Sequence, residues 1–380
     1  MANSKVLLVL LVVLAPLSVL ASEDSHPLPN DTAPVDWAMY DRMWVDGIPR
    51  ATNAEPMLGH LDEQQATEFL DDTALKWSRH NHCATCHTNV PYLMVRPLLH
   101  DRNFAAMEEV KTIVKAYAVK QMEQRPDDAN FLIAAIASAL AVNDARNGRD
   151  LDPDVGKMFD FLWTTQDPDG AWRYSLDGML PFLERNYYYV SLLVALGVGY
   201  APGHYYETPS AQAGFGKLQA FLRSNIPENT HERTVLLWAS VRTPGLLTPE
   251  QQMSFETALR KLQNADGGWT LPALGRWPRH DGPPNDPKGP SDGYATGLAT
   301  MVLCERGYGT RDPSIRQAIS WIETHQRSSG RWFTRSTYSD RFRNYLSNMG
   351  TAYALMALKS CEASTKQPMA RSVSGIQPSR

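Results

Sequence analysis

QDPDGAW at residues 166–172, QNADGGW at 263–269 and QRSSGRW at 326–332 are three copies of one pattern, with glutamine, glycine and tryptophan at the first, fifth and seventh positions. Glycine permits the positive φ of a tight turn, glutamine can bond free backbone groups at helix ends, and tryptophan covers the joint with a broad apolar face. The pattern predicts three helix-to-helix loops built on Gln166, Gly170, Trp172, Gln263, Gly267, Trp269, Gln326, Gly330 and Trp332.

Helical patterning surrounds these loops. Apolar residues recur at three- and four-residue intervals, Asp-Pro and Thr-Pro pairs mark helix starts, and Gly or Asn marks helix ends. Essentially no segment alternates with period two, so strands should be rare. We count six pairs, each an amphipathic helix followed by a more apolar one, at 61–100, 103–142, 153–200, 211–241, 249–307 and 312–361.

The three loops resemble the Gln–Trp motifs of squalene–hopene cyclases and the related prenyltransferase repeats. The resemblance extends from about residue 60 to residue 361. It implies an all-α fold, a terpenoid cyclase-like α/α toroid, in which six helical hairpins close into a ring with outer helices first and inner helices second. We therefore assign 61–361 to the ring, 22–60 to an irregular lead-in and 362–380 to a flexible tail.

The set of acidic residues that the cyclase reaction needs is incomplete in this chain. That family carries Asp-x-Asp-Asp-Thr at the head of an inner helix, and the matching stretch here is DGYAT at 292–296. Asp292 matches, whereas Tyr294 and Ala295 replace the second and third acids, and a phenol is too weak an acid to protonate an alkene. In protein prenyltransferases an Asp, a Cys and a His hold a zinc ion. Here Asp292 is near a matching position, but the Cys and the His are missing. The sequence therefore disfavours both activities.

Residues 83–87 read CATCH, the attachment signature of c-type haem. Two thiols add to the haem vinyl groups and the adjacent histidine becomes the proximal iron ligand. The sequence thus predicts haem c held by Cys83, Cys86 and His87, in the loop of the first hairpin at the rim of the ring. A disulfide between the two cysteines, a zinc ion or a vestigial motif are the alternatives. Candidates for a distal ligand are Met94, His80, His82 and His100.

An export signal precedes the ring. Lys5 is followed by an apolar run at 6–20 and by small residues up to Ala21, which predicts a signal peptide cleaved near Ala21; an uncleaved anchor is the competing interpretation. The mature protein is then periplasmic or secreted, without a transmembrane span. In such a compartment Cys304 and Cys361, near the ends of the last two inner helices, form either a disulfide or two buried thiols.

The charge of the chain bears on whether it binds nucleic acid. The chain has a net charge of −4 and no basic run, which argues against nucleic acid. Ten Trp and fifteen Tyr suit a helical core or a pocket for a flat or apolar ligand. Residues expected near the cavity, at the starts of inner helices, are Glu184, Arg185, Tyr187, Tyr189, His231, Glu232, Asp292, Tyr294, Asn348 and Tyr353.

The insertion at 270–290 is long enough to act as a lid, and it carries His280 and Asp281 as a weak general-base pair. Asp292 and Tyr294 are the other weak catalytic candidates. Two functions follow. One is an exported haem c protein with a redox or electron-transfer role, a redox partner protein and a central cavity for an apolar or sugar-like ligand. The alternative is a non-redox toroid enzyme or binding module, cyclase-like or polysaccharide-active, whose Cys pair is structural or binds zinc.

Overall fold

The structure, a computed structural model, describes residues 45–99, 104–125, 129–172, 187–227, 229–243, 245–277, 279–341 and 344–366. The chain divides into Met1–Val35 and Asp36–Arg380, and every described residue belongs to the second unit. The predicted signal peptide, His100, Glu184, Arg185 and residues 367–380 lie outside the described residues.

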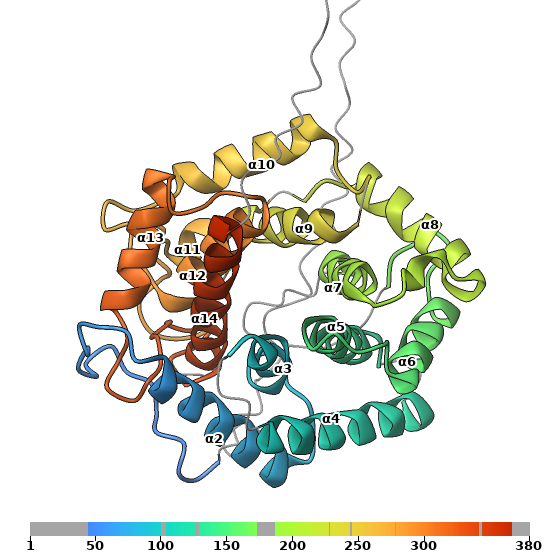
Figure 1. The fold of residues 1–380 in the computed structure, drawn as a ribbon, viewed down its shortest axis with the longest axis horizontal. Helices are drawn as coiled ribbons and strands as arrows, with labels where there is room; N and C mark the ends of the chain where they lie inside the picture. Colours follow the sequence, from blue (N-terminus) through green and yellow to red (C-terminus); the bar gives the residue numbers. More distant parts are fainter. Residues whose placement is uncertain are drawn as a thin grey trace, which may run out of the picture. The chain divides into compact units, whose positions relative to one another are not determined.

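Within the second unit the helices form a ring of two layers (Figure 1). The outer layer consists of α2 (Glu63–Asn81), α4 (Ala105–Gln124), α6 (Pro153–Thr164), α8 (Pro209–Ser224), α10 (Pro249–Lys261) and α13 (Pro313–Thr324). The inner layer consists of α3 (Asn89–Val95), α5 (Asn130–Arg146), α7 (Tyr187–Tyr200), α9 (Thr230–Arg242), α12 (Gly293–Glu305) and α14 (Tyr345–Lys366). The two sets alternate along the chain, which confirms an all-α toroid of six hairpins with outer helices first.

Shorter segments complete the ring: the helix α11 (Leu271–Leu274) and the 3-10 turns η1 (Arg96–Leu98) and η2 (Tyr205–Glu207). In the described ranges the chain makes no strand, only an isolated bridge between Met57 and Arg327. Side-chain caps fix several helix starts. Asp312 accepts bonds from the backbone of Ser314 and Ile315, and Thr248 forms a reciprocal capping box with Gln251.

The three repeated loops join neighbouring hairpins. Each tryptophan is fully buried and donates its indole N–H to the carbonyl ten residues earlier, at the end of the preceding outer helix. Each glutamine amide donates both to its own loop glycine and to a carbonyl near the start of the next outer helix, namely Gly214, Ser314 and Asp62. These bonds join each outer helix to the next one along the ring, and the third loop closes the ring onto α2.

Close packing joins the inner helices. A Cβ on Gly297 of α12 would lie 2.6 Å from the backbone nitrogen of Ala354 in α14, so only glycine allows this approach. A disulfide between Cys304 and Cys361 links the same two helices, which settles the alternative left open by the sequence. Helix α14 continues to Lys366, past the predicted boundary at Cys361, because hydrogen bonds such as Ser364 to the Tyr308 carbonyl hold its last turns.

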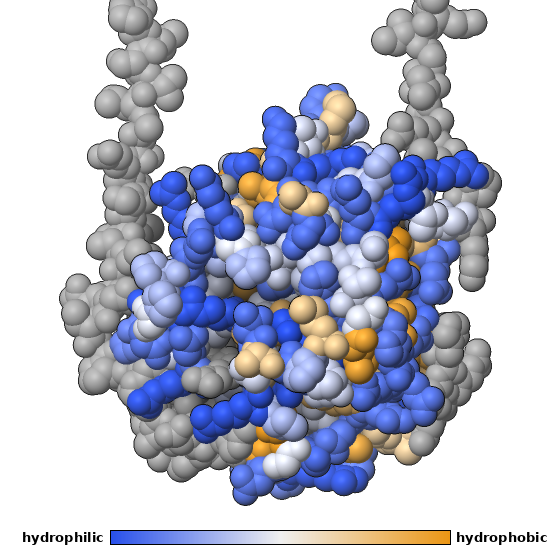
Figure 2. All heavy atoms as spheres, turned by 90° about the vertical axis from the view of Figure 1, so that its left-hand side faces the viewer, coloured by the Kyte–Doolittle hydropathy of each residue, from blue (hydrophilic) through white to orange (hydrophobic). Residues whose placement is uncertain are grey.

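One outer face of the ring is largely polar. Figure 2 shows the face over α13 and α2, where hydrophilic side chains predominate and hydrophobic ones are scattered. This agrees with the burial of apolar side chains between the two layers. None of the helices in the described ranges combines the length and the apolar character needed to cross a lipid bilayer.

Candidate functional site

A buried histidine and tyrosine meet inside the ring. His231, in the first turn of α9, places Nε2 2.7 Å from the hydroxyl oxygen of Tyr294, in the first turn of α12. Both side chains are almost completely buried. Both residues were expected from the sequence to lie near the cavity, but not as a pair. The fold brings them together because α9 and α12 are neighbouring inner helices.

Further rings from other elements surround this pair. Tyr189 of α7 stacks on His231 with ring centroids 5.9 Å apart, Trp277 of the insertion meets His231 edge-on at 5.8 Å, and Tyr353 of α14 meets Tyr294 edge-on at 5.1 Å. The Cys86 thiol is close enough to influence the pKa values of Tyr294 and Tyr353. We call this group the axial cluster; its members are Cys86, Tyr189, His231, Trp277, Tyr294 and Tyr353.

One stripe along each of two inner helices is slightly less buried than several residues beside it. On α7, Tyr189, Leu193 and Tyr200 keep 6–7% of their surface exposed, whereas Val190, Leu192 and Val194 keep none. The spacing of four and seven residues puts the first three on one helix face. On α14, Tyr345, Met349 and Tyr353 repeat this pattern at a spacing of four. Tyr353 also contacts Trp238 of α9, so these stripes face the interior of the ring.

Burial keeps the axial cluster uncharged. It lowers the pKa of His231 to about 3 and raises the pKa values of Tyr294 and Tyr353 well above their ordinary range. Two buried polar atoms nearby have no hydrogen-bond partner among the described residues, Nε1 of Trp277 and Oδ1 of Asn348. An unpaired buried donor or acceptor is costly unless water or a ligand satisfies it. The cluster is therefore an apolar surface with a few unused polar atoms.

Asp292 is a helix cap. Its carboxylate accepts bonds from the backbone of Ala295 and Leu271 and from the hydroxyl of Thr334. Burial raises its pKa to about 6, while these hydrogen bonds lower it. Such a group is a far weaker acid than alkene protonation requires, and its bonds to Ala295, Leu271 and Thr334 hold the start of α12 in place.

Residues 83–87 form the corner between α2 and α3. Asn89 holds the corner: its Oδ1 accepts the Thr85 backbone N–H at 2.6 Å, and its Nδ2 donates to the Cys83 carbonyl and to Ser78 Oγ. Helix α2 extends to Asn81, directly before this corner, and Cys86 and His87 are buried. The Cys86 side of the corner therefore faces the ring interior and not the rim.

The Cys83, Cys86 and His87 side chains, as the structure places them, do not fit a covalently attached haem. The Cys83 thiol lies beside Trp77 and influences the pKa of Tyr117, whereas the buried Cys86 thiol influences the pKa values of Tyr294 and Tyr353. Thr85 Oγ1 lies 2.6 Å from Nδ1 and 3.1 Å from Nε2 of His87, and Tyr345 covers a face of the imidazole with ring centroids 3.9 Å apart.

The other ligand candidates are scattered. Cys83 and Cys86 are free thiols and not the disulfide considered above. Met94 packs in the core and His80 and His82 are exposed. In the described part of the chain no three His, Cys, Asp or Glu side chains converge as a metal site, so the zinc alternative finds no further ligands there. The guanidinium of Arg96, which follows the motif at the end of α3, pairs with the carboxylate of Asp71 at 2.8 Å.

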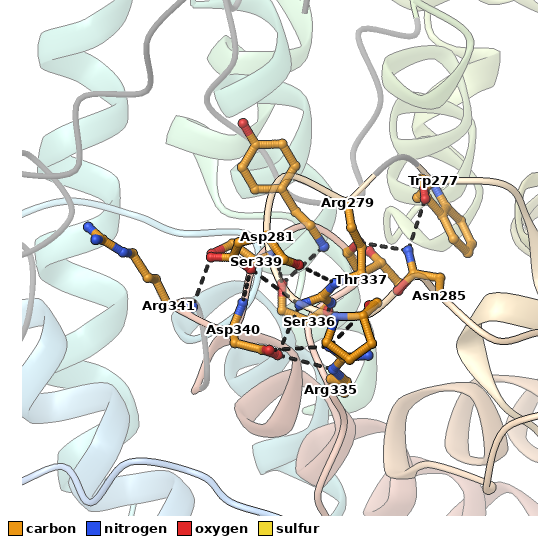
Figure 3. A network of polar contacts seen from close by, with 12 residues as sticks. Trp277, Arg279, Asp281, Asn285, Arg335, Ser336, Thr337, Ser339, Asp340 and Arg341 are labelled. Atoms are coloured by element: carbon orange, nitrogen blue, oxygen red, sulfur yellow. Dashed lines mark hydrogen bonds and ion pairs between the residues drawn. The ribbon is translucent and has the colours of Figure 1, made fainter.

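The insertion is bound to the segment that precedes α14 (Figure 3). Asp281 accepts bonds from the Ser339 hydroxyl and the Asp340 backbone, and Arg279 pairs with Asp340 at 2.9 Å. The ring of His280 stacks on Tyr338, at 5.6 Å between centroids. Asp281 thus serves to anchor the insertion, and no bond between Asp281 and the His280 ring is among its contacts.

Sequence reasoning missed one pocket altogether. It has a volume of about 490 Å³ and lies between the second and third repeated loops, where the insertion, the end of α13 and the lead-in meet. Asp292 is in its wall, but Trp321, Arg327 and Phe333 carried no signal in the sequence. Their only common feature is their position near the third loop.

No protein-family model matches the chain, and no curated protein matches its sequence. Among solved structures it is similar to a protein from Actinoplanes (16% identity, TM-score 0.48, covering 79% of this chain and 100% of that one). It is similar to the type II terpene cyclase MstE from Scytonema (12% identity, TM-score 0.48, covering 80% and 100%). It is also similar to a protein described as a wild-type glycosidase (12% identity, TM-score 0.41, covering 86% and 94%).

Proposed function

We propose that the protein is a binding module whose ring interior holds a largely apolar ligand carrying a hydrogen-bonding group. The observation that carries the proposal is the His231–Tyr294 pair at 2.7 Å, set among the rings of Tyr189, Trp277 and Tyr353 from three further elements. Ligand pockets in proteins combine apolar walls with a few placed polar groups.

The polar atoms of the axial cluster favour a ligand with a hydroxyl, amine or carbonyl. Among the described residues, Trp277 Nε1 in the cluster is an unused donor, and Asn348 Oδ1, five positions before Tyr353 on α14, is an unused acceptor. A charged ligand is disfavoured, because burial holds His231, Tyr294 and Tyr353 in their neutral forms and burying an unpaired charge is costly. Cyclisation is not part of this proposal, because Tyr294 and Ala295 stand where that chemistry needs acids.

A fluorescent probe tests the proposal. N-phenyl-1-naphthylamine is neutral and apolar with one N–H group, and its emission rises in apolar surroundings. We expect one molecule to bind per folded chain, with a Kd on the order of micromolar for a ligand of this size. Replacing Tyr294 by Phe removes a polar partner without changing the volume and should weaken binding severalfold. No saturable binding to the folded chain would refute the proposal.

A second proposal follows from the CATCH motif: covalent haem c on Cys83 and Cys86, with His87 as proximal ligand. The specific observation in its favour is that both thiols are free while the other two cysteines form a disulfide, and thioether formation needs free thiols. Attachment would require Thr85 and Tyr345 to leave the imidazole. The test is periplasmic expression together with c-type maturation enzymes. A Soret band that survives acid–acetone extraction supports covalent attachment of haem, and its absence refutes this proposal.

A further inference from the structure

The pocket between the second and third repeated loops is separate from the axial cluster. None of the axial cluster residues lines it, and its walls come from the insertion, the third loop and the lead-in. Its volume of about 490 Å³ lies within the usual range for small-ligand sites. We refer to it as the loop pocket.

Two aromatic rings with fixed orientation stand in its wall. Trp321 donates its indole N–H to Asp266 at 3.2 Å and stacks on His325 at 4.3 Å between centroids. Phe333 is half-buried, with the Arg327 guanidinium 5.8 Å from its ring centroid. The exposed part of Phe333 is an apolar face of the kind that suits the C–H face of a sugar ring, whose hydroxyls remain available for polar partners.

One buried donor in the same wall is unused. Arg327 keeps only 9% of its surface exposed and donates through Nη1 and Nη2 to Asn53 and Glu55. Its Nε has no hydrogen-bond partner among the described residues. A buried guanidinium N–H without a partner is costly, and an acceptor brought to this wall by a small shift of the Arg327 side chain would relieve that cost.

The charge of the wall indicates a neutral ligand. Four aspartates and two arginines line the pocket, which leaves an excess of negative charge: Asp266, Asp286, Asp292, Asp340, Arg327 and Arg335. Arg335 is already paired with Asp340 at 3.0 Å. An anionic ligand would be repelled, whereas hydroxyl groups can donate to carboxylates and accept from Arg327.

We propose that the loop pocket binds a neutral oligosaccharide. The wall is organised in advance, because Asn285 donates to the carbonyls of Trp277 and Thr337 and so fixes the insertion beside the pocket. A site held in this way loses little ordering entropy on binding.

Isothermal titration calorimetry with cellohexaose, xylohexaose and N-acetylchitohexaose tests the proposal, with hexagalacturonate as the anionic comparison. At least one neutral hexasaccharide should bind with a Kd on the order of 0.1 mM. Phe333→Ala should weaken that binding about tenfold. Phe161→Ala, a matched change of a half-buried phenylalanine on outer helix α6, should leave it unchanged.

Three outcomes would overturn the proposal: no binding of any neutral hexasaccharide at millimolar concentration, equal affinity in Phe333→Ala and the parent chain, or tighter binding of hexagalacturonate. Binding of N-phenyl-1-naphthylamine is measured in the same samples. We expect it to be unaffected by the sugar and by Phe333→Ala, so that failure of the loop pocket and failure of the interior site are seen separately.

Discussion

Single glycines decide how closely neighbouring hairpins approach. Gly267 has a φ of +92°, and a Cβ there would lie 2.6 Å from the Gln317 carbonyl oxygen of α13; Gly330 stands in the same relation to Gln65 of α2. Both the backbone conformation and the space therefore require glycine. Gly148 also has a positive φ, +64°, but has open space around it.

Gly267→Ala should destabilise the protein by more than about 2 kcal/mol, because it adds a clash with α13 to the cost of a left-handed alanine. Gly148→Ala is the matched control and should cost about 1 kcal/mol from the backbone alone. Urea unfolding of both variants measures the difference. Equal losses would show that the close approach to α13 does not matter.

Glu232 gives a pH dependence with a definite sign. Burial raises its pKa to about 7, while the bond from Asn229 lowers it. Between about pH 4.5 and pH 7 the folded chain keeps this proton and the unfolded chain loses it, so stability falls as the pH rises through this range, by at most about 3 kcal/mol. Glu232→Gln keeps a hydrogen-bond acceptor for Asn229 and removes the charge.

We therefore expect Glu232→Gln to gain stability relative to the parent chain as the pH rises from 5 to 8. Denaturant midpoints at several pH values give this difference directly. The charging of His231, whose pKa burial lowers to about 3, has the opposite sign but is present in both proteins. A difference that stays constant with pH would contradict the assignment of the shift to Glu232.

The residue pattern predicted the loops but not their partners. Gln263, Gly267 and Trp269 are close in sequence, so their local turn could be anticipated from residue type. The bond from Gln263 to Ser314 spans 51 positions and depends on which hairpins become neighbours. The same limit explains why His231 and Tyr294, 63 positions apart, were candidates without being recognised as a pair.

The insertion acts as an element bound to the ring. Its length suggested a lid, yet Arg279 is almost buried and joins Asp281, Asp340 and the Ser336 carbonyl (Figure 3). Arg276, three positions earlier, is exposed. The length of a loop indicates freedom only where few contacts hold it, and contacts of this kind could not be read from 270–290 alone.

Arg279→Ala should loosen the insertion and increase the rate of its cleavage by thermolysin severalfold, because local opening controls proteolysis. Arg276→Ala is the control and should cleave like the parent chain. Mass spectrometry of the first fragments locates the cut. If both variants resist thermolysin equally, the Arg279 bonds do not hold the insertion in place.

Several links close the whole ring between its last and first hairpins. Gln326 Oε1 accepts the Asp62 backbone N–H at 2.6 Å, Lys359 of α14 pairs with Glu63 of α2 at 2.7 Å, and Arg331 pairs with Glu55 of the lead-in at 3.1 Å. The disulfide between Cys304 and Cys361 fastens the last two inner helices beside this joint. The sequence predicted closure from its six hairpins, but the lead-in's part in it had no signal.

Loss of the disulfide should destabilise the ring without abolishing it. Cross-linking two residues separated by 57 positions restricts the unfolded chain, and removal of such a bond typically costs about 2–4 kcal/mol. The Cys304→Ser, Cys361→Ser double variant should therefore melt at a lower temperature than the parent chain. Added reductant should lower the melting temperature of the parent only; an equal effect on the variant would point to another cause.

The interior ligand site is the central claim, and filling the ring tests it most directly. Leu193 of α7 lies on the same helix face as Tyr189 and keeps 7% of its surface exposed, whereas Leu75 is half-buried on outer helix α2. We predict that Leu193→Trp weakens N-phenyl-1-naphthylamine binding at least about tenfold by occupying the space, while Leu75→Trp, with equal helical content, binds as the parent does. Unchanged affinity in Leu193→Trp would contradict the claim.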